Sequence, residues 1–494
     1  MSEQRPKLLY VLLVVLFVGL CVSLNFAEPT HKQIQKQSSL KSSVNSGDLY
    51  LQLPGQFIIA SMTGFKEVIA GLLWIRADEF FHTGQYEAIL PIVRMVTWLD
   101  PHNVDVYTTG AWHLDYNFVD EQQMSDKRYI PGSIALMKEA IENNPNQWNL
   151  YFELGWMHYN RKMMDFESGL KYIEEACKRD DVDINTGKRI PRPQFVDRML
   201  AYQYEKLGRI DDAIAQLLKC RERDKKLLKE YKKGEPYLDT DSFDVIDRNL
   251  AEMYLRKAWR YGDMEAYRKG LEIAKRLANR PHPSMAKWAV EGSARDYAQR
   301  LASNNPPRDA LKPLDAGFSV TWKKIKPRVL LISGKLNLLP ASEYKDLASE
   351  VYTHRYQDNQ ALDANHKKLW EDGARVHWKL MDYDYKMPEL TTFNWNLDPN
   401  ETVVWDDLYV SGGSFSGKAD LSNPKDESFY PLKKDKYRLI VWVSPIQPGV
   451  PDYVQDRIGW KGDALTDKNY LDTKTMPGFK LLRKEFILDR KDIM

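Results

Sequence analysis

At 494 residues the chain is longer than one hydrophobic core usually serves, so we expect two or three domains. The 43% hydrophobic and 12% aromatic content predicts ordered domains, and 71 basic against 69 acidic residues exclude the strongly basic surface that is typical of nucleic-acid binders. Three cysteines are too few for a disulfide framework, which favours free, buried thiols at Cys177 and Cys220.

The N-terminal segment, residues 1–27, is predicted to be a transmembrane anchor. A run of 17 uncharged residues extends from Leu8 to Leu24, which just spans a bilayer core. Arg5 and Lys7 precede it, so the positive-inside rule predicts a cytoplasmic N-terminus and places the bulk of the chain on the periplasmic or extracytoplasmic side. A cleaved signal peptide and a lipoprotein signal ending at Cys21 are the alternatives.

Residues 28–48 are polar and rich in Ser, Gln and Lys, without apolar periodicity. This composition predicts a flexible stalk between the anchor and the folded part of the chain.

Residues 49–303 contain repeated pairs of amphipathic helices. The predicted second helices often follow a Gly turn and end in an acidic or Asp-Pro turn; they cover residues 84–101, 133–145, 165–181, 208–224 and 262–281. The predicted first helices cover residues 70–84, 106–118, 150–160, 196–208 and 245–262. Gly155, Ala201 and Ala251 are small residues between larger ones at helical spacing, which allows two helices to approach closely.

This pattern resembles the tetratricopeptide-repeat (TPR) family, although the units are longer than its usual period, with extra loops at 119–132, 182–195 and 228–243. Residues 285–303 are predicted to form a capping helix. The resemblance implies a concave surface that binds extended peptides or partner proteins. The candidate groove residues are Arg76, Trp112, His113, Trp156 and Tyr204. The alternative for each aromatic residue is a place in the core between repeats.

After a Pro- and Asn-rich linker at 304–317, residues 318–494 are predicted to form a β-rich domain resembling a sandwich. Val376, Trp378 and Leu380 alternate with polar residues, as in a strand that is buried on one face. The predicted strand segments are 326–339, 374–385, 391–397, 401–415, 436–444 and 479–488. Residues 341–371 are interpreted as an inserted helix or long loop.

No complete catalytic signature occurs in the sequence. Residues 411–418 reproduce the spacing of a phosphate-binding loop, but Ala419 replaces the hydroxyl residue that would reach Mg²⁺, which favours a glycine-rich β-turn. His354, His366 and His377 lack the close spacing of metal ligands on one helix. We therefore predict no catalytic, cofactor-binding or metal-binding residues.

Anchor, stalk and repeats together predict an α + β multidomain chain that is a membrane-anchored scaffold or adaptor of the cell envelope. Its partners would be other envelope or membrane proteins. The alternative is an envelope enzyme or carbohydrate-binding protein whose site lies in the β-domain, suggested by Trp395, Trp405 and Trp460.

Overall fold

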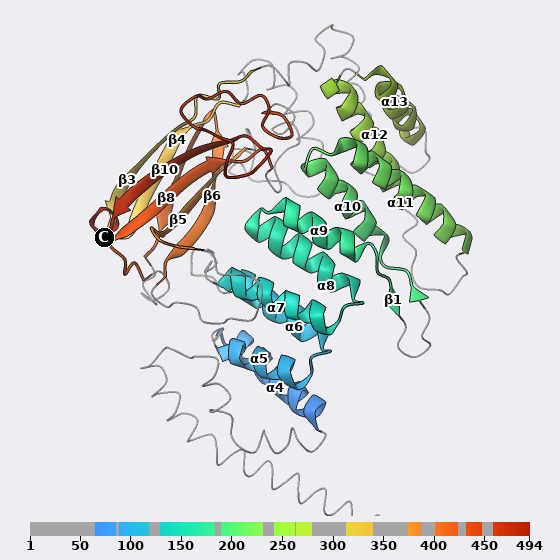
Figure 1. Ribbon diagram of the computed structural model, residues 1–494, viewed down its shortest axis with the longest axis horizontal. Helices are drawn as coiled ribbons and strands as arrows, with labels where there is room; N and C mark the ends of the chain where they lie inside the picture. Colours follow the sequence, from blue (N-terminus) through green and yellow to red (C-terminus); the bar gives the residue numbers. More distant parts are fainter. Residues whose placement is uncertain are drawn as a thin grey trace, which may run out of the picture. The chain divides into compact units, whose positions relative to one another are not determined.

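The structure is a computed structural model (Figure 1). It describes residues 65–84, 88–117, 129–182, 189–230, 242–261, 263–278, 313–338, 374–386, 401–422, 431–446 and 458–494.

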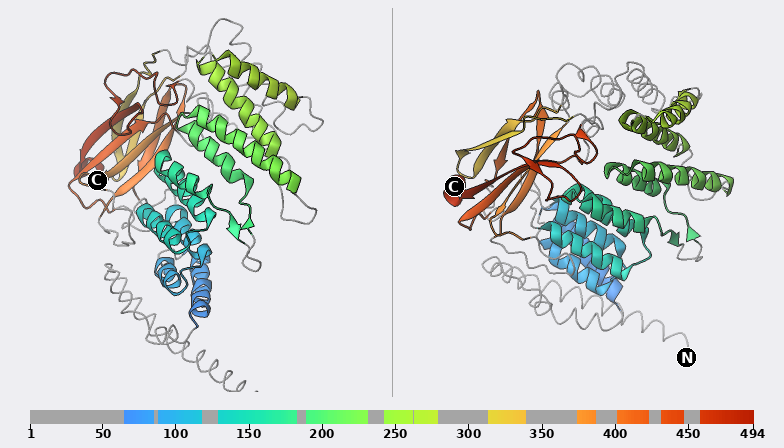
Figure 2. Two further views of the ribbon diagram at one scale, coloured as in Figure 1. Left: turned by 45° about the vertical axis from the view of Figure 1, so that its right-hand side comes forward. Right: turned by 45° about the horizontal axis from the view of Figure 1, so that its top comes forward.

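The first half of the described chain consists of consecutive helix pairs (Figures 1 and 2). The first helices are α4 (Lys66–His82), α6 (Val104–Trp112) with the π-helical η2 (His113–Asn117), α8 (Trp148–Glu153) with the π-helical η4 (Leu154–Met163), α10 (Gln194–Lys206) and α12 (Ser242–Tyr261). The second helices are α5 (Ile89–Leu99), α7 (Ile130–Asn143), α9 (Phe166–Ala176), α11 (Ile210–Glu230) and α13 (Met264–Ala278). The TPR-like pairing of helices is therefore confirmed.

Local sequence explains where these helices start and stop. Gly84 and Gly208 both have φ of 73°, a left-handed conformation that glycine adopts without strain, so each turns the chain into the next helix. Asp165 caps α9, because its side chain accepts a hydrogen bond from the Ser168 amide at 3.0 Å. The predicted turns at Gly84 and Gly208 are thus confirmed, whereas Gly262 lies outside the described residues.

Close approach of helices depends on Gly155 in η4. A Cβ atom added there would lie 2.8 Å from the carbonyl oxygen of Gly169 in α9 and 2.9 Å from Cγ1 of Ile173. Such distances leave no room for a side chain, as the spacing of small residues predicted.

One hydrophobic core joins the first two helix pairs to α8 and η4 of the third. Its fully buried members include Val93 of α5, Tyr107 of α6 and Leu136 of α7. Between α9 and α10 the chain forms a short antiparallel pair of strands, β1 (Asp181–Val182) and β2 (Arg189–Ile190), which overlaps the predicted loop 182–195.

The second half contains one eight-stranded sheet in the order β3-β4-β7-β6-β5-β8-β10-β9, with antiparallel pairing throughout. The strands are β3 (Ser319–Lys326), β4 (Val329–Lys335), β5 (Arg375–Asp382), β6 (Val403–Ser411), β7 (Ser414–Asp420), β8 (Lys436–Val443), β9 (Leu471–Asp472) and β10 (Leu481–Asp489), and a short helix, α18 (Arg490–Ile493), follows. The sequence did not predict β3, because most of its side chains are polar and exposed.

The eight described strands of the second half pair in one continuous sheet and not in the two separate sheets of the predicted sandwich. Gly412 and Gly413, both with positive φ, make the turn of the β6–β7 hairpin, which confirms the predicted glycine-rich turn. The β6–β7 hairpin connects β3 and β4 on one side with β5, β8, β10 and β9 on the other. One core contains Ile332 of β4 together with Trp378 of β5 and Val441 of β8, so the curled sheet packs its halves against each other (Figure 2).

Apolar residues of the C-terminal half also enter clusters of the helical half. Trp460 is 3% exposed and packs with Ile214 of α11 and Leu250 of α12. A second cluster combines Phe166 of α9 with Phe479. The predicted domain boundaries stay predictions, but the two halves of the described chain share apolar packing.

Several predicted segments lie outside the described residues. They are the anchor and stalk (1–48), the capping helix (285–303), the insert (341–371) and the strand at 391–397. Among the helices within the described ranges, none combines the length and apolar character needed to cross a membrane.

Candidate partner-binding surface

Aromatic side chains recur at one position of successive first helices. Trp112, Trp156 and Tyr202 each follow a small buried residue, which is Ala111, Gly155 or Ala201. Because the small residue is turned toward the neighbouring helices, the next residue occupies the same adjacent face in all three repeats. We call this surface the aromatic face.

Cationic side chains lie over the rings of the aromatic face. The ring of Trp112 stacks on that of Tyr116 with centroids 6.1 Å apart, and Lys162 Nζ lies 3.5 Å from the Tyr116 centroid. In the next repeat Trp156 meets Tyr202 edge to face at 5.6 Å, with the Arg161 guanidinium 5.8 Å from the Trp156 centroid. Rings covered by cations suit partners with aromatic or acidic side chains.

The five predicted groove residues have different surroundings. Arg76 on α4 is exposed, pairs with Glu79 and lies over Phe80. Trp112 is 40% exposed, whereas His113 is only 6% exposed and packs on Phe81, and burial lowers its pKa. His113 follows exposed Trp112 by one residue, so its side chain points toward the neighbouring helix and packs there.

Tyr204 and Trp156 are both half-buried. The Tyr204 hydroxyl donates to Glu174 Oε1 at 2.7 Å, and desolvation, then this hydrogen bond, raises the pKa of Tyr204 to about 12. Both aromatic residues pack against the cluster that contains Ile446 and Phe479. The part of the aromatic face around Trp112 is consequently the more open part. Partner binding by the five residues stays a prediction.

Sequence reasoning missed a buried Ser133–His158–Asp115 group. Ser133 Oγ lies 2.9 Å from His158 Nδ1, and Asp115 Oδ2 lies 2.5 Å from the same nitrogen. A hydrolytic relay needs the nucleophile and the carboxylate on opposite ring nitrogens, so this geometry does not support one. The group instead links α7 with the two π-helical segments, and no local sequence signal predicts it.

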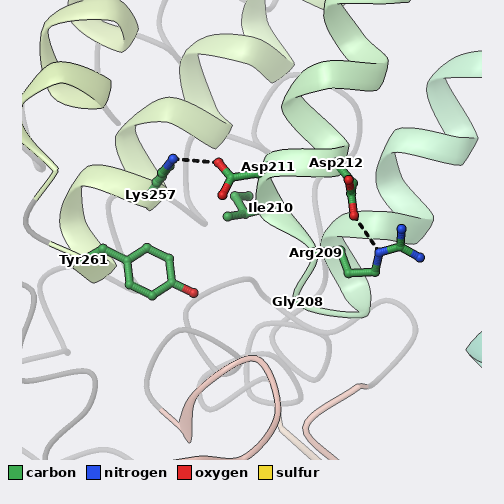
Figure 3. A pocket seen from close by; sticks show the side chains of 7 residues that line it. All are labelled: Gly208, Arg209, Ile210, Asp211, Asp212, Lys257 and Tyr261. Atoms are coloured by element: carbon green, nitrogen blue, oxygen red, sulfur yellow. Dashed lines mark hydrogen bonds and ion pairs between the residues drawn. The ribbon is translucent and has the colours of Figure 1, made fainter.

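An open pocket of about 400 Å³ lies where α10 turns into α11, beside the end of α12 (Figure 3). It is lined by Gly208, Arg209, Ile210, Asp211, Asp212, Lys257 and Tyr261. Lys257 Nζ pairs with Asp211 at 2.6 Å, and Arg209 Nε pairs with Asp212 at 2.7 Å. These opposite charges compensate one another, so the pocket offers little net charge to a ligand.

Of the three tryptophans that suggested a site in the β-domain, neither of the two described ones is exposed. Trp460 is buried against the helices, Trp405 is half-buried, and Trp395 lies outside the described residues. His377 Nδ1 lies 2.6 Å from Asp407 Oδ1. In the described part of the chain, no cluster of three or more His, Cys, Asp or Glu side chains could hold a metal ion.

No family model and no curated protein matches the sequence. Among solved structures, the crystal structure of MamA protein matches at 15% identity with a TM-score of 0.27, covering 44% of this chain and 98% of that one. PilW, described as a widely conserved type IV pilus biogenesis factor, matches at 14% identity with a TM-score of 0.25, covering 48% and 94%. A human IFIT1 dimer with PPP-AAAA matches at 17% identity with a TM-score of 0.23, covering 45% and 43%. At such low TM-scores the assignment of helical repeats rests on the helix pairing itself.

Proposed function

We propose that this chain is a cell-envelope scaffold whose TPR-like helix pairs bind an extended segment of a partner protein on the aromatic face. The observation that carries the proposal is the recurrence of Trp112, Trp156 and Tyr202 at one helix position, with cations over neighbouring rings. Rigid aromatic side chains supply large contact areas at low entropic cost, and they are enriched among residues that dominate binding energy.

The most sensitive position is expected to be Trp112, because it is the most open aromatic residue of this face. Replacing a central interface tryptophan with alanine costs about 2 kcal/mol or more, which is roughly a 30-fold loss of affinity. Trp98 on α5 is a matched control, since it is 53% exposed but belongs to a second helix.

The test uses a photo-crosslinking amino acid placed at position 112 or 98 of the full chain in intact membranes. A polypeptide segment should be crosslinked from position 112 and not from position 98. The synthetic segment should then bind the purified chain, with about 30-fold weaker binding to Trp112→Ala and unchanged binding to Trp98→Ala. Equal crosslinking from both positions, or equal affinities of the two variants, would refute the proposed surface.

We further propose that the chain is held by an uncleaved segment at residues 1–27, with its N-terminus in the cytoplasm. Support comes from the uncharged run from Leu8 to Leu24 and from Arg5 and Lys7 before it. Protease added to intact spheroplasts should digest the large domain. Protection of this domain until the membrane is permeabilised would show the opposite topology.

A further inference from the structure

One face of the sheet carries two neighbouring cations that have no carboxylate partner among the described residues. Lys379 of β5 lies directly opposite Trp405 of β6 and Ile440 of β8 in the strand register. Arg438 is two residues from Ile440 on β8, so its side chain leaves the sheet on the same face as Lys379. The alternate residues of these strands, such as Trp378 and Leu439, belong to the opposite, core face.

The surroundings of Lys379 are aromatic. Its Nζ lies 4.8 Å from the ring centroid of Trp405 and 5.4 Å from that of Tyr385. Burial, and then the positive charge of Arg438, lower the pKa of Lys379 to about 8. The ring faces attract the ammonium group, but they do not replace the hydration that a buried charge loses.

Arg438 is also incompletely satisfied. Its Nη2 donates to the carbonyl oxygen of Tyr385 at 3.3 Å, while its Nε is buried and has no hydrogen-bond partner among the described residues. A buried guanidinium donor without an acceptor costs free energy, and so does a second cation close to it.

Two carboxylates of this face pair with other cations. Asp407 contacts His377 Nδ1 at 2.6 Å and Arg375 Nη1 at 3.4 Å. Glu485, opposite Ile440 on β10, accepts from Arg483 at 2.6 Å. Neither of these carboxylates pairs with Lys379 or Arg438. Burial, and then the charge of Glu401, raise the pKa of nearby Tyr385, but Glu401 is not among the groups that shift the pKa of Lys379.

We propose that Lys379 and Arg438 form a binding site for a carboxylate ligand whose apolar part lies against Tyr385 and Trp405. The ligand oxygens would accept hydrogen bonds from the Lys379 ammonium group and lie beside the Arg438 guanidinium group. Binding neutralises the two like charges, so the ligand gains affinity by removing the repulsion between them. Either a free organic acid or the acidic side chain of a polypeptide supplies this chemistry.

Thermal unfolding of the full chain in mild detergent tests the site with benzoate, with neutral benzamide as the matched probe and with ionic strength held constant. Benzoate at ten times its Kd should raise the melting temperature by about 2 °C, because a ligand that binds only the folded state stabilises it. Lys379→Met should remove this gain, and Arg438→Leu should weaken benzoate binding about tenfold. Without ligand, Lys379→Met should melt at the same or a higher temperature, since it removes an uncompensated buried charge.

Lys484→Met is the control variant. Lys484 lies 5.7 Å from the ring centroids of both Tyr470 and Phe486, so it has similar aromatic contacts elsewhere on the sheet. Its replacement should leave the benzoate effect intact. NMR of 13C-methylated lysines should show the pKa of Lys379 rising on addition of benzoate.

A blocked peptide, acetyl-Phe-Glu-Phe-amide, distinguishes the two sources of the carboxylate. Stabilisation by benzoate assigns the site to a free acid, and stabilisation by the peptide alone assigns it to an acidic side chain. The proposal is overturned if neither benzoate nor the peptide raises the melting temperature. It is also overturned if these ligands stabilise Lys379→Met as strongly as the natural chain.

Discussion

Replacing Gly155 with tryptophan is expected to unfold the third helix pair and lower the melting temperature sharply. The first atom of any side chain at this position would meet the Gly169 carbonyl oxygen at 2.8 Å and Ile173 Cγ1 at 2.9 Å. Overpacking costs about 1–3 kcal/mol even for smaller additions, so an indole should cost more than about 3 kcal/mol. Far-ultraviolet circular dichroism should show loss of helical signal and earlier melting.

Gly71→Ala is the matched control for Gly155→Trp. Gly71 lies in α4, and a Cβ atom there would have no neighbour within 4 Å. Alanine at this exposed helical position should therefore stabilise the chain by up to about 1 kcal/mol. A Gly155→Trp chain that melts like the natural one would mean that Gly155 is not at a helix crossing.

Truncating Trp460 to alanine should remove about 3–5 kcal/mol of stability, the usual cost for a buried tryptophan. Its ring lies 5.4 Å from the Arg256 guanidinium and 6.0 Å from the Tyr261 ring. Arg256 itself forms a buried ion pair with Glu205. Loss of the indole leaves a cavity and exposes this pair to water, so urea unfolding should shift to a lower midpoint.

Trp98→Ala serves as the comparison for Trp460→Ala, because Trp98 is exposed and its replacement should change stability by less than about 0.5 kcal/mol.

The sequence predicts that fragments 48–303 and 318–494 each fold alone. The shared clusters add an expectation that fragment 48–303 melts below the full chain, since it lacks Trp460 and Phe479. The shared packing would contribute little if fragment 48–303 melted at the same temperature as the full chain. The same would follow if Trp460→Ala lowered the free energy of unfolding by less than about 1 kcal/mol.

Local patterns account for what the sequence predicted well. Helix pairing followed from apolar spacing and from turns such as Gly84 and Gly208, whose backbone conformation depends on neighbouring residues only. The close approach at Gly155 was visible because a small residue among larger ones marks a helix contact. Strand β5 was predicted from alternation and β8 from its many β-branched and aromatic residues, and both signals are properties of consecutive residues.

The candidate site was less predictable, because exposure changes between adjacent residues. Trp112 and His113 are neighbours in the sequence, yet one is exposed and the other is buried against Phe81. Side chains of neighbouring helical residues point about 100° apart. An error of one position in the repeat register therefore assigns a buried residue to the surface, or an exposed residue to the core. Tyr204 was chosen by residue type, and its hydrogen bond to Glu174 was not foreseeable from its own helix.

By itself, the sequence determined the order of the helix pairs and of most strands, several of the turns between them and the faces that carry small residues. Only the tertiary structure decided that the β3–β10 pairing is continuous, that Trp460 packs among helices, and that Lys379 lies near Arg438 without a carboxylate partner among the described residues. Periodicity and turn chemistry act over a few residues, whereas these three features join segments far apart in the chain. Their energies come from burial and charge contacts that exist only after the chain has folded.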